Sequence, residues 1–119
     1  MKYTDSHEWI RVYGKEGLVG ISRHAQKELG EIVYIELPEV GKEVKAGEEI
    51  AVLESTKAAA DIYSPVSGTI LRVNEKLKKD PALINTSPEE EGWIFEVALI
   101  APEELSALMS QEDYISIVE

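Results

Sequence analysis

Hydrophobic residues occur in short runs along most of the chain, and these runs are rich in β-branched and aromatic residues. Polar segments that contain glycine, proline or aspartate separate the runs. Short apolar runs with this punctuation predict β-strands. Strands this short and this regularly spaced are typical of a β-sandwich or a β-barrel. We expect strands at residues 3–13, 18–21, 32–37, 50–53, 62–63, 70–73 and 94–99.

Two segments depart from the strand pattern and predict helices. Ser22 is a good N-cap for a helix over residues 23–29, and Gly30 suits the position after its last turn. Near the other end of the chain, Pro102 suits a first helical position, and two glutamates follow it in the first turn. We therefore expect short helices near residues 22–29 and 102–109, and a further helical turn in the tail at residues 111–119.

An internal repeat relates two parts of the chain. Residues 30–35 align with residues 68–73, and residues 44–50 align with residues 77–83. Each copy is expected to form a strand, a turn and a second strand, and the two copies should pack on each other with approximate two-fold symmetry. The segment that joins them, residues 54–63, should form a hairpin at one end of the sandwich, with Lys57 near its tip.

The composition limits the classes of function. The chain has 119 residues, with 12 Lys+Arg and 23 Asp+Glu, which gives a formal net charge of -11 at pH 7. This length favours a single domain over residues 1–119, and the excess of acids argues against binding to nucleic acid or to an anionic membrane. The chain contains no Cys, which excludes disulfides, thiolate metal sites and cysteine nucleophiles. No apolar stretch has the length of a signal peptide or a membrane span, so we expect a soluble intracellular protein.

Lys57 is the residue that stands out chemically. Its neighbours Thr56, Ala58 and Ala59 are small, and no acid is adjacent to it in the sequence. Turns usually contain Gly, Asn, Asp or Pro, so a turn made of alanines is unusual. Alanine leaves the lysine amine open to a modifying enzyme. The plain alternative is a solvated turn lysine without a special role.

The sequence around Lys57 resembles a known modification site. Lys57 stands in Glu54-Ser55-Thr56-Lys57-Ala58-Ala59-Ala60-Asp61, and Tyr63-Ser64-Pro65-Val66-Ser67-Gly68 follows. These stretches closely resemble the lipoylation site of glycine cleavage system H proteins. The resemblance continues, in order, in Ser6-His7-Glu8-Trp9, Val19-Gly20-Ile21-Ser22, His24-Ala25-Gln26, Glu36-Leu37-Pro38-Glu39-Val40-Gly41, Leu83-Ile84-Asn85, Ser87-Pro88 and Gly92-Trp93. An ordered set from about Lys2 to beyond Trp93 is far more specific than one lysine motif.

The departures from the family pattern are small. Family members more often carry Val in place of Thr56, Ser in place of Ala60 and an aromatic residue in place of Glu89. None of these differences removes the acceptor lysine. Biotin-carrying domains share the hairpin, but they resemble Met-Lys-Met at the acceptor, and Lys57 has no Met beside it.

The resemblance implies an all-β, lipoyl-domain-like barrel-sandwich hybrid of two quasi-symmetric halves, with the short helices named above. It implies lipoic acid attached covalently to Lys57, with the cofactor supplying the chemistry and the protein positioning it. The protein would then be a carrier and not an enzyme. Its implied partners are a pyridoxal-phosphate-dependent glycine decarboxylase (P protein), a folate-dependent aminomethyltransferase (T protein), dihydrolipoamide dehydrogenase (L protein) and a lipoate ligase or lipoyl transferase. A bacterial or archaeal source would make it cytoplasmic.

The family also implies a cleft in which the loaded arm folds back and is protected from water. Ser6, Glu8 and Asp61 occupy the matching positions. We expect these residues to receive the ammonium end of the arm, because a carboxylate in a partly desolvated cleft attracts a cation. The alternative is that Glu8 is one of many surface acids and that Asp61 only shapes the hairpin.

Other readings of the sequence stay open. A lipoyl carrier could instead relay lipoyl groups to other 2-oxoacid complexes, and an unmodified acidic β-sandwich could dock a partner. His7 and His24 could bind a metal, but their spacing is poor, and no nucleophile elbow supports a serine hydrolase. Trp9 and Trp93 are expected in the core or at its rim. Residues 89–92 are expected to form a solvated loop, with docking as the alternative.

Overall fold

The computed structural model describes residues 1–118 of the chain. Its helices are α1 (Arg23–Leu29), α2 (Lys76–Lys79), α3 (Leu83–Thr86), the 3-10 helix η1 (Pro102–Ala107) and α4 (Gln111–Val118). Its strands are β1 (Lys2–Tyr3), β2 (Glu8–Tyr13), β3 (Glu16–Ile21), β4 (Ile32–Glu36), β5 (Glu43–Val44), β6 (Glu49–Ser55), β7 (Ala59–Tyr63), β8 (Gly68–Val73), β9 (Phe95–Leu99) and β10 (Met109–Ser110).

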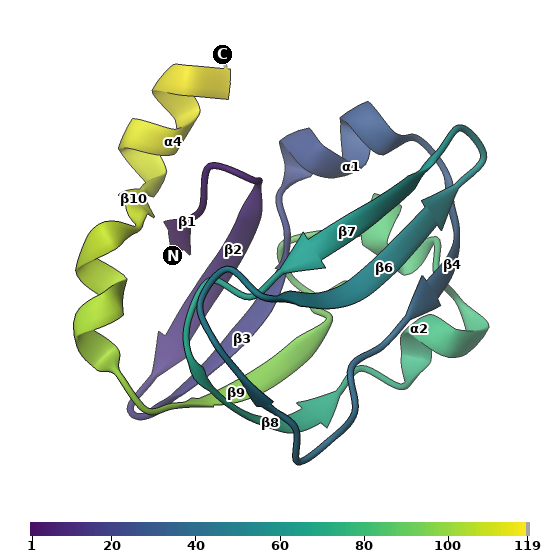
Figure 1. The fold of residues 1–119 in the computed structure, drawn as a ribbon. Coiled ribbons are helices and arrows are strands. Elements are labelled where there is room, and N and C mark those ends of the chain that lie inside the picture. The colour runs from purple at the N-terminus through teal and green to yellow at the C-terminus, as the bar shows by residue number, and fades with distance from the viewer. Residues whose placement is uncertain (119) are drawn as a thin grey trace.

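Two antiparallel sheets form the body of the molecule (Figure 1). The larger sheet has the order β10-β1-β2-β3-β9-β8-β5, and the smaller has the order β4-β6-β7. The β6–β7 hairpin, with its turn at residues 56–58, projects at one end of the smaller sheet (Figure 1). The expected all-β sandwich with short helices is confirmed.

The core lies between the sheets and follows from the alternation along the strands. Val19 and Ile21 of β3, Ile70 of β8 and Leu53 of β6 are all at most 2% exposed and belong to one apolar cluster. A second, smaller cluster contains Tyr3, Trp9 and Tyr114, and it joins the start of the chain to its last helix.

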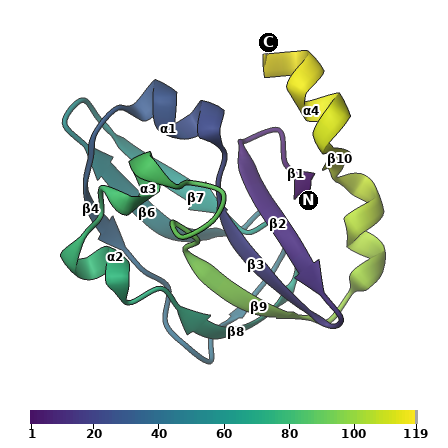
Figure 2. The ribbon, with the colours of Figure 1, turned by 180° about the vertical axis from the view of Figure 1, so that it is seen from behind.

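Local signals placed the first helix correctly. Ser22 caps α1, because its Oγ accepts a hydrogen bond from the backbone N–H of Ala25 at 3.1 Å. Gly30 ends the helix with a φ of 82°, a left-handed value that glycine adopts without strain. Helix α3 lies beside α1, as both views show (Figures 1 and 2). No helix within residues 1–118 is long and apolar enough to cross a membrane.

Three details of the expected elements are corrected. The run at residues 3–13 is two strands, because a turn at residues 4–7 separates β1 from β2. The second copy of the repeat has no second strand, since residues 77–83 lie in α2, a turn and the start of α3. The expected helix at 102–109 is a 3-10 helix that ends at Ala107, and Met109 belongs to β10.

The tail forms α4, which is longer than the single turn expected there. The prediction for Glu119 lies outside the described residues. Helix α4 begins directly after β10, and β10 pairs with β1, so the end of the chain returns to its beginning.

Candidate functional site

The Lys57 hairpin closes without glycine because a serine side chain organises its turn. Ser55 N donates to the carbonyl of Ala58 at 2.8 Å. The Ser55 Oγ accepts from the backbone N–H groups of Lys57 and Ala58, each at 3.1 Å, and donates to the Ala58 carbonyl. A serine that bonds its own turn in this way replaces the usual turn residues. Lys57 therefore lies at the tip of the hairpin, as the sequence predicts.

The Lys57 side chain is exposed and lies over the C-terminus of α1. Its Nζ is 3.5 Å from the carbonyl oxygen of Glu28, one of the last carbonyls of that helix. A Cβ added at Gly30 would lie 2.8 Å from Lys57 Cε, so glycine leaves room for the lysine stem. Within residues 1–118 Lys57 forms no ion pair. The amine is held by one long hydrogen bond and is open to reaction.

The surroundings of the lysine are fixed by Asn85 of α3. Its Oδ1 accepts from the N–H of Ile32 at 2.9 Å, and its Nδ2 donates to the carbonyl of Gly30 at 2.8 Å. Asn85 thus clamps the link between α1 and β4. The hairpin is attached to the same link, because Thr56 N donates to the Glu31 carbonyl at 3.0 Å.

Glu8 is a buried carboxylate with hydrogen bonds to both oxygens. It lies at the start of β2 and is 1% exposed. Its Oε1 accepts from the hydroxyls of Thr4 and Ser6, each at 2.5 Å, and its Oε2 accepts from the backbone N–H of Tyr63 at 3.1 Å. Burial raises the pKa of Glu8, while these hydrogen bonds act in the opposite direction. The structure therefore brings Ser6 and Glu8 together.

Asp61 is exposed and lies in β7 two residues before Tyr63. Side chains two apart share a face of a strand, so Asp61 lies on the same side of β7 as Tyr63. It lies between the Lys57 turn and the point where β7 meets Glu8. The length of β7 from Ala59, just after the Lys57 turn, to Tyr63, beside Glu8, is about 13 Å at ~3.3 Å per residue.

Two groups at Glu8 were missed by the sequence reasoning. Thr4 Oγ1 accepts from the N–H of Glu8 at 3.0 Å as well as donating to its carboxylate. Hydroxyl side chains at positions 4 and 6, before an acid at position 8, are a local sequence signal that could have revealed Thr4 as a partner of Glu8. The Tyr63 N–H has no such signal, because only folding brings β7 to β2.

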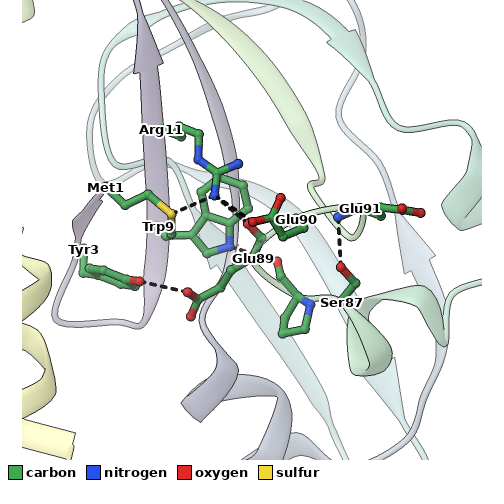
Figure 3. Close-up of polar contacts among 9 residues, drawn as sticks. Met1, Tyr3, Trp9, Arg11, Ser87, Glu89, Glu90 and Glu91 are labelled. Atoms are coloured by element: carbon green, nitrogen blue, oxygen red, sulfur yellow. Dashed lines mark hydrogen bonds and ion pairs between the residues drawn. The ribbon is translucent and has the colours of Figure 1, made fainter.

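The loop at residues 89–92 is not simply solvated, which corrects the sequence reading. Figure 3 shows Tyr3 donating to Glu89 Oε1 at 3.0 Å and Arg11 donating to the Glu89 carbonyl at 2.9 Å. Trp9 Nε1 donates to the carbonyl of Pro88 at 3.0 Å. The loop therefore fixes β1 and β2, which carry the residues around Glu8. Trp9 is fully buried and Trp93 packs at the edge of the second cluster, as expected.

His7 and His24 lie close together near the end of β2 at which Glu8 is found. Their ring centroids are 4.9 Å apart, and His24 also lies 3.8 Å from a carboxylate oxygen of Glu28. His7 Nδ1 is 2.7 Å from the hydroxyl of Tyr114. Within the described part of the chain, no group of three or more His, Asp or Glu residues has a geometry suited to a metal ion.

Comparison with known proteins places the chain in a family. The family model described as "Glycine cleavage H-protein" matches residues 1–119. The chain belongs to the glycine cleavage H-protein family. Among curated relatives, the glycine cleavage system H protein of Thermotoga maritima is 52% identical over 113 residues, which are 95% of this chain and 91% of the relative.

Other relatives agree with this assignment. The glycine cleavage system H protein of Aeromonas hydrophila is 52% identical over 120 residues, covering 100% of this chain and 93% of the relative. A crystal structure of a glycine cleavage system H protein from Mycobacterium marinum superposes with a TM-score of 0.89 at 37% identity, covering 98% of this chain and 94% of that one. Membership of this H-protein family supports a lipoyl-carrier role in the glycine cleavage system.

Proposed function

We propose that this protein carries lipoate on Lys57 and moves the aminomethyl group of glycine between enzymes of the glycine cleavage system. Glycine decarboxylase would load the arm, the aminomethyltransferase would unload it, and dihydrolipoamide dehydrogenase would reoxidise it. A lipoate ligase or lipoyl transferase would attach it. The protein itself would act as a carrier without catalysing a step. If the protein comes from a bacterium or an archaeon, the cytoplasm is the compartment in which it would act.

The exposed amine of Lys57 carries this proposal. It lies at the tip of a hairpin whose turn is hydrogen-bonded by Ser55, its neighbours are small, and it has no ion-pair partner within residues 1–118. An amide at Nζ would remove its charge and its attraction to the helix carbonyl of Glu28. When bound, lipoate supplies a dithiolane that accepts and releases the aminomethyl group. The hairpin holds the attachment point outward, and tethering raises the effective concentration at a docked enzyme.

Ser6, Glu8 and Asp61 are proposed to hold the loaded arm on the carrier. Asp61 lies along β7 between the lysine turn and Glu8, so an arm that followed this strand would meet Asp61 first. The Glu8 carboxylate is buried, and hydrogen-bond donors fix its orientation. A carboxylate in this environment attracts a cationic group more strongly than a solvated carboxylate does. Ser6 is exposed and its hydroxyl donates to Glu8 Oε1, so rotation of Ser6 would free one of the two hydroxyl contacts of that oxygen, and Thr4 would keep the other.

Intact mass spectrometry tests the attachment site. The protein is incubated with lipoate, ATP and a lipoate ligase, and we expect one lipoyl group, mapped by peptide analysis to Lys57. The Lys57→Arg variant should gain none, while Lys45→Arg, a change at another exposed lysine in a turn, should be modified like the wild type. An unmodified wild type, or an adduct on Lys57→Arg, contradicts the proposal and leaves the unmodified interaction module as the better reading.

The role of Glu8 is tested on the loaded carrier. Glu8→Ala should be lipoylated normally, but its aminomethylated form should decay about tenfold faster, because a charge-assisted contact to the ammonium is lost. The Glu8→Gln variant retains the side-chain volume and reports the charge alone. Glu54→Ala, a change at an exposed acid near the hairpin, serves as the control. Decay at the wild-type rate in both Glu8 variants excludes the proposed role.

A glycine–bicarbonate exchange assay with the decarboxylase separates glycine cleavage from lipoyl relay. The lipoylated protein should support exchange, and Lys57→Arg should not. If the lipoylated protein supports no exchange but donates its lipoyl group to another 2-oxoacid complex, relay is the function.

A further inference from the structure

The hydroxyl of Tyr114 joins three distant parts of the chain. Tyr114 belongs to α4, and its hydroxyl lies 2.7 Å from His7 Nδ1 and 2.6 Å from Ser22 Oγ. His7 directly precedes β2, and Ser22 directly follows β3. Ser22 N also donates to the His7 carbonyl at 2.9 Å. His7 and Ser22 come directly after the last pair of the β2–β3 ladder, which is Glu8 with Ile21. The Tyr114 hydroxyl therefore bridges the side chains of His7 and Ser22 at the end of this ladder.

His7 has a backbone conformation that needs support. Its φ is 75°, and it is the only non-glycine residue with a positive φ in the described part of the chain. This conformation is uncommon for residues with a side chain. It closes the turn at residues 4–7, in which His7 N donates to the Thr4 carbonyl at 3.2 Å and Thr4 N donates to the Glu8 carbonyl at 2.9 Å. The same turn places the hydroxyls of Thr4 and Ser6 on the Glu8 carboxylate.

The Tyr114 ring is held independently of its hydroxyl. It is 3% exposed and stacks on Tyr3, with centroids 4.3 Å apart and planes at 3°. Tyr3 is itself bonded to Glu89 (Figure 3). The other carboxylate oxygen of Glu89 accepts from the backbone N–H of Arg23 at 2.9 Å. Removing the hydroxyl should therefore leave the ring and α4 in place.

We infer that Tyr114 is a positioning residue for Glu8. The chain of contact runs from the Tyr114 hydroxyl to His7, from His7 to the turn at residues 4–7, and from the hydroxyls of that turn to the Glu8 carboxylate. Within the described residues, the hydroxyl of Tyr114 forms no hydrogen bond with Lys57, Ser6, Glu8 or Asp61. The inference rests on the proposed function of Glu8, and it assigns the last helix of the chain a part in that function.

The Tyr114→Phe variant tests this inference, since it keeps the stacked ring and removes only the hydroxyl. Amide hydrogen exchange at Thr4, His7 and Glu8 should become about fivefold faster, the effect of losing the hydrogen bond between the hydroxyl and His7. Exchange in β8 and β9 should not change. Lipoylation should proceed at the wild-type rate, while the aminomethylated form should decay several-fold faster. Tyr13→Phe, a change at a half-exposed tyrosine in β2, is the matched control.

A double variant shows whether Tyr114 acts through Glu8. Glu8→Ala with Tyr114→Phe should decay no faster than Glu8→Ala alone, because the two changes interrupt the same contact. Wild-type exchange at Thr4, His7 and Glu8 in Tyr114→Phe overturns the inference, and so does additive decay in the double variant. If Glu8→Ala itself decays like the wild type, the proposed arm site fails, and faster exchange in Tyr114→Phe still supports positioning of the Glu8 carboxylate.

Discussion

At the scale of single residues, His7 and Glu8 show how burial acts on neighbouring groups of opposite charge. Burial lowers the pKa of His7, and the nearby His24 lowers it further. Burial raises the pKa of Glu8, although its hydrogen bonds oppose the change. Relative to the unfolded chain, folding therefore shifts the equilibrium of each side chain toward its neutral form. As the pH falls, protonation of His7 should remove stability and protonation of Glu8 should add it.

The His7→Asn variant separates the two effects. Asparagine tolerates a positive φ and does not titrate. The substitution therefore removes the pH-dependent contribution of His7 to the free energy of unfolding, and any other effect on that free energy is the same at every pH. Because the pKa of His7 is lowered on folding, the wild type should lose stability relative to the variant as the pH falls below about 6.5. Urea unfolding between about pH 8 and about pH 5 measures this difference. A difference that is constant with pH would contradict it.

At the scale of elements, two glycines that align in the repeat have different reasons to be there. Gly30 ends α1 with a positive φ and leaves room for the Lys57 stem. Gly68 lies in β8 where the neighbouring strand approaches closely, and an added Cβ would be 2.0 Å from the carbonyl oxygen of Ala98 in β9. The alignment therefore pairs two glycines whose roles differ, because the role of each depends on its own surroundings.

The Gly68→Ala variant should destabilise the protein by about 3 kcal/mol, because the clash is with backbone and a strand has to move. Gly17→Ala is a matched control in β3, where the added Cβ would meet the end of the Ile10 side chain at 2.8 Å. Ile10 is itself buried in the core, but its side chain can adjust without movement of a strand, so the loss should be smaller. Chemical denaturation of both variants gives the comparison, and equal losses would argue against the backbone clash.

At the scale of the whole molecule, the net charge bears on how the protein meets its partners. The formal charge of -11 would become more negative by one on lipoylation of Lys57. A carrier has to dock with several enzymes in turn, and a strongly acidic surface suits enzymes with basic docking faces. The expectation of one domain over residues 1–119 stays a prediction.

Turnover in the reconstituted glycine cleavage system should therefore weaken with salt. Raising the ionic strength from about 0.1 M to about 1 M shortens the Debye length from about 10 Å to about 3 Å and screens exposed charges. The Michaelis constant of the decarboxylase for the lipoylated protein should rise, while lipoylation of Lys57 stays possible. Turnover that does not respond to salt would exclude electrostatic docking but would not contradict the proposed lipoylation of Lys57.

Much of the architecture was determined by local features of the sequence. Short β-branched runs became strands, and Ser22 with Gly30 delimited α1, because strand alternation and helix caps depend on residues close in the chain. The position of Lys57 at a hairpin tip follows from the same local rules. The ordered motifs also indicated the family from the sequence alone.

Tertiary structure decided the rest. The apolar positions in residues 77–83 are too few to distinguish a strand from a helix by their pattern. In the folded protein these residues belong to α2, a turn and the start of α3, and the two helices bury Leu77 and Ile84 in the core. Glu8 accepts a hydrogen bond from the backbone N–H of Tyr63, and the His7 side chain meets the hydroxyl of Tyr114, 107 positions away in the chain. Such contacts exist only when distant strands and helices pack together, so no local pattern could specify them.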